Sequence, residues 1–584
     1  MLRRIASAQV ILTLAVLTAA CSSERVAAPK SNVQSCGASA DLIGSFDPSG
    51  DVEPVAFPLG PTLQRASAAA SLSIAPLNGA VVGFPAPSAQ LNDTNARYLV
   101  VPQYPVQGAM PDSTPFTLSV GTGAVAVATP FSQAELTLSA QGAFDARLRR
   151  IETRLPLTGR LDPHGGAARV AGASTGPEAV RKFYVLGSID GNCFVQTTAR
   201  LRYSGARVYI YEDTGVQDTL STSEYADFGK LFDEVLYPID TGAFGSPSDV
   251  DGNGHIIVLL SQRINQLTAK ADCSTKGYIA GYFFGYDLSN GSGSNRSEIF
   301  YSIAPDVAAR YSCAHTIAQV KRGTPPTFIH EFQHMISYNQ HVLLRGGQGE
   351  ATWLNEGLSH IAEELGSKYY EAKYPAPLGR TSPTQLFPDS SQGFIVPDFQ
   401  NAYNYLRSSR KHSVTTFAGV GTLEERGAAW LFLRWLGDQK GEQIYKQLDQ
   451  TTRRGIDNVA AAAGEPFPAL FGDFGIATYA DSIDGVPRTS VPQRYRFTSR
   501  DTRKIFARIA CGTAVPGQSC TPPITPDTLG CANSSTESMV QGTSAYYLIG
   551  GSAGCSSTRI DMTASGGGTL PSALQPQIAI FRLP

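Results

Sequence analysis

The stretch from residue 325 to residue 365 constrains the fold of this chain more than any other. It contains H-E-F-Q-H at 330–334 and W-L-N-E-G at 353–357. Four residues of an α-helix advance about 400°, so His330 and His334 project from one face, roughly 6 Å apart along the axis. Two imidazoles placed in this way can both reach one Zn²⁺ at about 2.0–2.1 Å. The spacing therefore predicts a metal site built on a helix, with Glu331 close to a water bound to the metal.

Two helices are expected around these motifs. Pro325 and Pro326 are typical of a helix start, and the apolar residues that follow repeat at a spacing of 3.6. Glycines at 346, 347 and 349 interrupt the pattern. A second helix, from about Thr352 to Leu365, would carry a polar face that consists of Glu356, Ser359, His360 and Glu363. Two helices joined by a loop can turn such a set of ligands toward each other.

The two motifs together resemble the gluzincin zinc metallopeptidases, and the stretch from about Phe183 to Leu436 is most similar to the hyicolysin-type family. The resemblance implies a zincin-like catalytic domain, a mixed sheet with a helical zinc-binding subdomain. It further implies that His330, His334 and Glu356 bind Zn²⁺ and that Glu331 is the general base. The implied activity is a zinc endopeptidase acting on extracellular proteins or peptides.

The sequence departs from this family at the groups that support the metal and the carbonyl oxygen. Thermolysin-like enzymes have an aspartate where this chain has His360, so Glu363 or Glu350 is needed as the partner of a ligand histidine. Aminopeptidases of the family carry Y-x-K-G and G-x-M-E-N, and neither occurs here, which argues against that activity. The donor to the oxyanion stays open. We name His360 and Tyr405 as catalytic candidates, and the alternatives are Tyr403 and His412.

Other interpretations of the motifs remain. A solvated helix could carry two histidines by chance, and a zinc hydrolase could act on another bond, such as an ester. The alternative function is a catalytically silent surface binding or adhesion lipoprotein on the same fold. The intact Glu331 argues against it, since loss of this glutamate is the simplest way to lose activity.

The N-terminus indicates export. Residues 1–20 combine two arginines with a short apolar run, which is typical of a secretory signal and too short for a transmembrane helix. Small residues before Cys21 resemble a bacterial lipobox, with residues 21–35 as a tether. We therefore expect a bacterial lipoprotein at the outer membrane or cell surface, or a secreted protein if cleavage is ordinary. Cys21 would be its one link to a membrane.

Cysteines and charge agree with an extracellular protein. Without Cys21, eight cysteines remain, none with C-x-x-C spacing, so disulfides are expected, among them Cys511–Cys520 and Cys531–Cys555. The net charge is −2 and 16% of residues are charged, so nothing suggests nucleic acid as a partner. The expected partner is a protein or peptide substrate, and the expected state is a monomer.

The predicted fold class is a multidomain α+β protein, with β-sandwich-like domains on both sides of the catalytic domain. The N-terminal β-rich domain covers 36–178, the catalytic domain 181–488, and a disulfide-stapled β-sandwich 490–584. The stretch from Ser132 to Thr158 is expected to be a linker or a helix. The N-terminal domain could cover the active site, act as a removable pro-region or serve as a spacer. Residues 294–301 predict an edge strand beside the cleft, where a peptide could add.

A second motif concerns calcium. Asp249, Asp251 and Asn253 imitate the first half of a calcium loop, but an EF-hand requires glutamate at its twelfth position, which here is Leu260. An EF-hand is therefore excluded. A Ca²⁺ site of another kind and a plain Asp/Gly turn both remain open.

Overall fold

The computed structural model describes only part of the chain. The described residues are 71–72, 82–84, 88–91, 97–108, 113–121, 139–155, 161–164, 176–191, 193–374, 387–415, 421–481, 488–511, 522–550 and 558–583. The predicted signal peptide, Cys21 and the tether lie outside these ranges, so their assignment stays a prediction. Within the described ranges, every helix is too short or too polar to cross a membrane.

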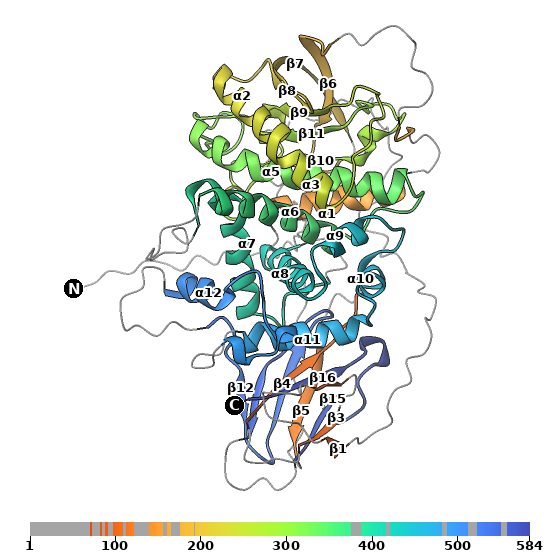
Figure 1. The fold of residues 1–584 in the computed structure, drawn as a ribbon, viewed down its shortest axis with the longest axis vertical. Coiled ribbons are helices and arrows are strands. Elements are labelled where there is room, and N and C mark those ends of the chain that lie inside the picture. The colour runs from red at the N-terminus through yellow and green to blue at the C-terminus, as the bar shows by residue number, and fades with distance from the viewer. Residues whose placement is uncertain are drawn as a thin grey trace, which may run out of the picture.

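A six-stranded sheet forms the upper part of the molecule (Figure 1). Its order is β10-β11-β9-β8-β7-β6, and β8, β9 and β11 run parallel while the other neighbours are antiparallel. The bounds are β6 (Val180–Leu186), β7 (Phe194–Ser204), β8 (Val208–Asp213), β9 (Ile256–Leu260), β10 (Gly281–Phe283) and β11 (Ile299–Ser302). The outer strand is thus β10, and the prediction that 294–301 forms the edge is wrong, because β11 from this stretch pairs on both sides.

Helix α5 (Ile317–Tyr338) carries the first motif beneath this sheet. It begins eight residues before Pro325, since Thr316 and Gln319 form a capping box that satisfies the first free N–H groups. The prediction that the prolines start the helix is therefore wrong, and both lie inside it. Apolar side chains on α5, among them Phe328 and Phe332, pack against the sheet and α2 (Thr222–Leu231), η2 (Phe232–Leu236) and α3 (Tyr237–Ala243).

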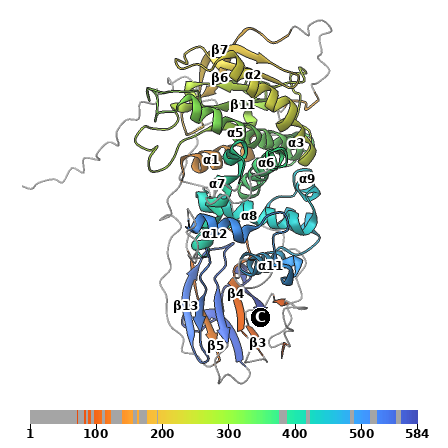
Figure 2. The same cartoon turned by 60° about the vertical axis from the view of Figure 1, so that its left-hand side comes forward.

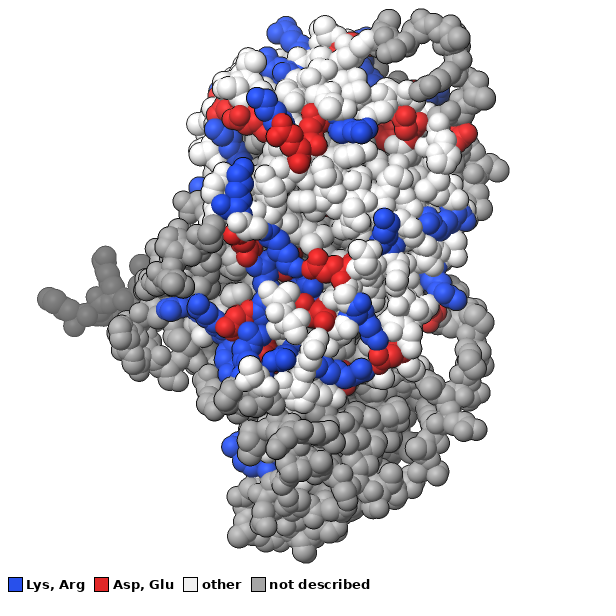
Figure 3. Space-filling view, viewed as in Figure 1, with Lys and Arg blue, Asp and Glu red and all other residues white. Residues whose placement is uncertain are grey.

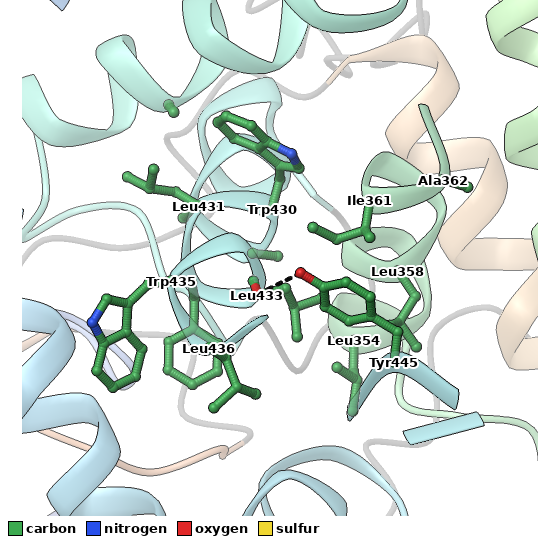
Figure 4. Packing of buried hydrophobic residues seen from close by; sticks show 14 of the residues in the cluster. Leu354, Leu358, Ile361, Ala362, Trp430, Leu431, Leu433, Trp435, Leu436 and Tyr445 are labelled. Carbon is green, nitrogen blue, oxygen red and sulfur yellow. Dashed lines mark hydrogen bonds between the residues drawn. The ribbon is translucent and has the colours of Figure 1, made fainter. Parts of the chain in front are cut away.

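Helix α6 (Thr352–Lys373) carries the second motif and extends beyond the predicted end at Leu365. Its apolar face packs on α8 (Leu423–Lys440), the buried helix predicted for 427–437 (Figure 4). The contact joins Leu354, Leu358 and Ile361 to Trp430 and Leu433, among other buried residues. Burying each large apolar side chain contributes about 1.5–3 kcal/mol, so this contact holds the second motif rigidly.

The remaining helices surround this pair or connect elements. Helix α7 packs on both α6 and α8, and α9 lies beside α8. The bounds are α1 (Ala140–Arg154), η3 (Gly285–Leu288), η4 (Asn339–Leu343), α4 (Gln262–Asn265), α7 (Asp389–Arg407), α9 (Gln443–Asp449), α10 (Gly455–Ala463), α11 (Phe467–Ala480), α12 (Thr502–Cys511), η6 (Arg488–Ser490), η7 (Gln493–Tyr495) and η8 (Ser572–Leu574). Helix α12 occupies part of the region that was predicted to consist of strands.

Strands from both ends of the chain form one sandwich in the lower part of the molecule (Figure 2). Its sheets have the orders β1-β3-β15-β5-β13 and β12-β14-β4-β16-β2. The bounds are β1 (Ser71–Leu72), β2 (Val82–Phe84), β3 (Ser88–Leu91), β4 (Arg97–Gln103), β5 (Thr114–Val120), β12 (Asp527–Leu529), β13 (Ser534–Met539), β14 (Tyr547–Gly550), β15 (Thr558–Ala564) and β16 (Gln577–Arg582). The expectation of two separate sandwiches is therefore wrong, because apolar residues of strands from the two ends of the chain pack together in one core.

The sandwich is joined to the helices through α11. Gln103 on β4 donates to the carbonyl of Phe471, and Gln577 on β16 donates to that of Pro468. The outer face of β4 contributes Leu99 and Val101 to the same apolar core as the helices. The described residues are thus a mixed α+β protein of several sheets, while the zincin-like class and the exact domain boundaries stay predictions.

One disulfide joins Cys273 to Cys313, which confirms disulfide bonding in this chain. Cys193 and Cys531 are disulfide-bonded as well. The predicted pairs Cys511–Cys520 and Cys531–Cys555 involve residues outside the described ranges, so these pairings stay predictions.

Candidate metal centre

Two helices bring the three predicted metal ligands together. His330 and His334 lie one turn apart on α5, and Glu356 on α6 faces both. The Nε2 atom of His330 lies 3.5 Å from one carboxylate oxygen of Glu356, and that of His334 lies 3.5 Å from the other. All three side chains are buried, and their ligand atoms lie within 4.8 Å of one another. This distance is short enough for one metal ion to bind all three.

The other ring nitrogen of each histidine is held by a group on α6. Nδ1 of His330 lies 2.7 Å from Oε1 of Glu363, and Nδ1 of His334 lies 3.0 Å from Oδ1 of Asn355. Such partners fix the ring and direct Nε2 toward a metal. Glu363 is confirmed as the partner of a ligand histidine. Glu350, the other candidate, instead accepts from the Asn458 side chain and the N–H of Gly455.

Glu331 points from α5 toward the edge of the sheet. Its Oε2 accepts a 2.7 Å hydrogen bond from the N–H of Phe283 on β10. Burial raises the pKa of Glu331 to about 8, although the nearby His330 acts in the opposite direction. A divalent cation beside the carboxyl would lower this pKa by the same electrostatics as any positive charge. The structure therefore places the predicted base between the metal ligands and the outer strand.

A buried ion pair that the sequence did not predict adjoins the ligands. The guanidinium of Arg426 on α8 lies 3.2 Å from Oε2 of Glu356 and 2.6 Å from Oδ2 of Asp145 on α1. Arg426 lies in the segment E-E-R-G at 424–427, the nearest match in this sequence to the Y-x-K-G of gluzincin aminopeptidases, and this partial match was the one signal for it. Nothing in the sequence signals Asp145, because its helix lies some 180 residues before the motifs.

The two additional catalytic candidates lie in different places. His360 is close to the ligands: its Nδ1 lies 3.1 Å from Glu363 and 2.9 Å from Asp398, and its ring centroid lies 5.0 Å from that of His330. Burial opposes its protonation, but the two carboxylates outweigh burial and raise the pKa of His360 to about 9. Through its contact with Glu363, the imidazole helps to hold that carboxylate in place.

Tyr405 has a different environment. Its hydroxyl is fully buried, and burial and Tyr546 of the sandwich raise its pKa well above the usual value. Among the described residues it has no hydrogen-bond partner. The alternative candidate His412 lies 3.2 Å from the hydroxyl of Thr422 through its Nδ1. Tyr405 as an oxyanion donor stays a prediction for which the structure adds no argument.

The Asp/Gly loop meets a third carboxylate. Asp249, Asp251 and the buried Glu298 bring oxygens within 4.8 Å of one another. Both Asp251 oxygens accept from Asn253, and Asp249 accepts from Gly254, which are the contacts of a turn. Glu298, which the sequence analysis missed, accepts from the backbone of the same loop at Val250. The turn is thus present, and calcium at this position stays a prediction.

The donor set at the helices fits zinc. Two imidazole nitrogens and one carboxylate form the composition of open catalytic zinc sites, which leave a position for water. Within the described part of the chain, neither carboxylate oxygen of Glu356 accepts a hydrogen bond, and Arg426 is its one ion-pair partner besides the two histidines. A dication would give these buried oxygens the partner that they lack, so the residues fit the ion.

No known family model matches this chain. A stretch of 174 residues is 30% identical to the neutral metalloprotease ShpI of Staphylococcus hyicus. This stretch makes up 29% of the present chain and 36% of that protein, so the chain spans about a third of its relative's length. The similarity to a metalloprotease is therefore limited to a part of each chain.

Proposed function

We propose that this chain is a zinc-dependent endopeptidase of the gluzincin type, which cleaves extracellular proteins or peptides. The observation that carries the proposal is the convergence of His330, His334 and Glu356, with Glu331 beside them at the edge of the sheet. The partial similarity to a neutral metalloprotease supports it. Export and lipid attachment at Cys21 are part of the same proposal, on the sequence argument alone.

The residues of the site have separate tasks in this mechanism. Zinc held by the three ligands would acidify a water and polarise the scissile carbonyl. Glu331 takes the proton of the attacking water and delivers it to the leaving amine. Glu363 and Asn355 keep the two imidazoles oriented. The N–H of Phe283 holds the carboxylate of Glu331 in place before reaction.

The test combines metal content with cleavage of an unstructured protein. We expect one zinc per chain, cleavage at internal bonds of casein, and loss of cleavage with 1,10-phenanthroline. Glu356→Ala should lower the zinc content, because a catalytic site needs three protein ligands. A zinc-loaded chain that cleaves no peptide, in its native form and in the α1 variants described below, would contradict the proposal and favour a binding protein.

A further inference from the structure

The outer strand β10 has one edge that pairs with no other strand, and the backbone groups of this edge face the predicted metal site. One side of β10 pairs with β11, with Tyr282 opposite Tyr301. On the other side, the carbonyls of Gly281 and Phe283 and the N–H of Phe283 bond to side chains and not to a strand. A strand edge that pairs with no further strand is a template onto which an extended peptide can add. Here this edge ends beside Glu331.

Helix α1 occupies this edge. The Gln141 amide donates to the carbonyl of Gly281 at 3.0 Å and accepts from the N–H of Ala280 at 2.7 Å. Arg149 donates to the carbonyl of Phe283, and Glu152 accepts from the N–H of Gly285. Gln141, Arg149 and Glu152 lie on the same face of one helix, so this face of α1 runs along the strand.

The same helix reaches the ligands and the sheet. Asp145, between Gln141 and Arg149, pairs with Arg426, which in turn contacts Glu356. Phe144 packs edge-on against Tyr282 with ring centroids 5.4 Å apart. Figure 1 shows α1, in orange, beside the green helices α5 and α6. Helix α1 therefore lines the strand edge and is linked to the predicted ligand Glu356 through Arg426.

We propose that α1 is an intramolecular occupant of the peptide-binding edge, so that the structure is a latent form of the enzyme. The proposal rests on the endopeptidase function. A substrate in extended form would offer its own N–H and C=O groups to Gly281 and Phe283, in place of Gln141 and Arg149. Both occupants satisfy the same backbone groups, so they exclude each other and α1 must leave before a substrate binds.

On the face shown in Figure 3, described Lys/Arg and Asp/Glu side chains lie close to each other. The bonds from α1 to β10 go to backbone groups, which every peptide carries. The expected substrate class is therefore an unstructured or locally unfolded polypeptide, which is recognised mainly through its backbone N–H and C=O groups. Side-chain preference would be a secondary effect.

The first experiment compares point variants of the full chain, because removing residues 1–178 would also remove strands β1 to β5 from the sandwich. Gln141→Ala removes the bonds to Gly281 of β10 and to the preceding Ala280, as well as the bond to Asp145 within α1, and should raise kcat/KM for casein by about tenfold. Asp145→Asn, which releases Arg426, should act in the same direction and serves if Gln141→Ala does not fold. Thr153→Ala is the control, because among the described residues its hydroxyl donates to the carbonyl of Arg150 within α1, and it should leave the activity unchanged.

The second experiment separates this proposal from catalysis. A fluorescent, extended peptide is titrated against the metal-free chain, which cannot turn over. Gln141→Ala should bind it about tenfold more tightly than the native chain, and a synthetic α1 peptide of residues 139–155 should compete. Equal affinity of a folded Gln141→Ala chain would overturn the proposal and leave α1 as a structural support. Tighter binding without cleavage by any variant would instead contradict the endopeptidase function alone.

Discussion

Two adjacent glutamates on α6 show how differently this fold uses buried charge. Glu363 points to the side of α6 that faces the predicted metal ligands, which we call the metal side, where it lies 2.7 Å from His330 and 3.1 Å from His360. Glu364 points to the opposite side, where it accepts from Arg500 at 2.8 Å and from the indole of Trp430 at 3.2 Å. Both side chains are buried, and although the two glutamates are adjacent in sequence, their carboxylates have different partners.

The two sides differ in how completely their polar atoms are paired. Around Glu364, Arg434 and Arg500 neutralise the carboxylate, and Glu371 and Asp438 pair with these arginines in turn. On the metal side, both oxygens of Glu356 and both ring nitrogens of His360 lack hydrogen bonds of good geometry within the described chain. On the Glu364 side both carboxylate oxygens accept hydrogen bonds, and the buried atoms without a hydrogen bond within the described chain belong to the arginines, at Nε of Arg434 and Nη2 of Arg500. A fully paired carboxylate fixes the structure, whereas a buried carboxylate without hydrogen bonds indicates a place where a ligand belongs.

The sharpest test of this contrast is Glu331→Gln on the metal side. We expect turnover to fall by about 10²–10⁴-fold, because the amide cannot accept the proton of the water. The melting temperature and the zinc content should stay the same, since the amide can still accept from Phe283. Hydrolysis at the native rate with zinc bound would remove Glu331 from its assigned role.

On the opposite side of α6, around Glu364, we expect a substitution to lower the stability of the fold. Glu364→Ala leaves Arg434 and Arg500 buried without their shared carboxylate, which costs about 3–5 kcal/mol. Chemical denaturation would measure the loss, and the activity per folded molecule should hardly change. A variant of native stability would mean that the arginines find other partners and that the cluster is not a structural anchor.

The sequence predicted the metal side because its chemistry is local. The H-E-x-x-H spacing follows from helix geometry alone, so His330 and His334 could be named from it, and the resemblance of the N-E-G phrase to that of gluzincins implied Glu356 as the third ligand. Asp145 and Gln141 could not, because no local pattern shows that a helix from residues 140–154 will lie against a strand at 281–283.

Long-range pairing also explains the errors in the fold. Strands such as β5 and β13 are separated by some 400 residues, and alternation in each strand shows an apolar face but not its partner. Two half-sandwiches at the ends of a chain therefore look like two domains. The start of α5 was misplaced for a local reason, since the capping box at Thr316 was overlooked in favour of two prolines.

Glu363→Gln compares the two sides of α6 through a smaller expected effect, a loss of zinc affinity. The amide keeps the volume but holds His330 less strongly, and loss of such a partner typically lowers metal affinity by about 10- to 100-fold. Competition with a chromophoric zinc chelator would measure the affinity. Glu364→Gln is the matched control on the next residue, and we expect it to leave the affinity unchanged. Equal affinities in both variants would show that Glu363 does not support the ligand.

The smallest expected effect is a pH dependence that belongs to Glu364. Burial favours the protonated carboxyl, but Arg434 and Arg500 outweigh burial and lower the pKa of Glu364 from 4.5 to about 2. The unfolded chain therefore binds this proton first as the pH falls, and the stabilisation, complete above pH 4.5, is lost progressively down to pH 2. By pH 3 the loss amounts to about 2 kcal/mol relative to neutral pH. Urea denaturation of the native chain and of Glu364→Gln between pH 6 and pH 3 would isolate this contribution as a difference between the two curves. Parallel curves would mean that the carboxylate is not held by the arginines, and the contrast between the two sides of α6 would fail.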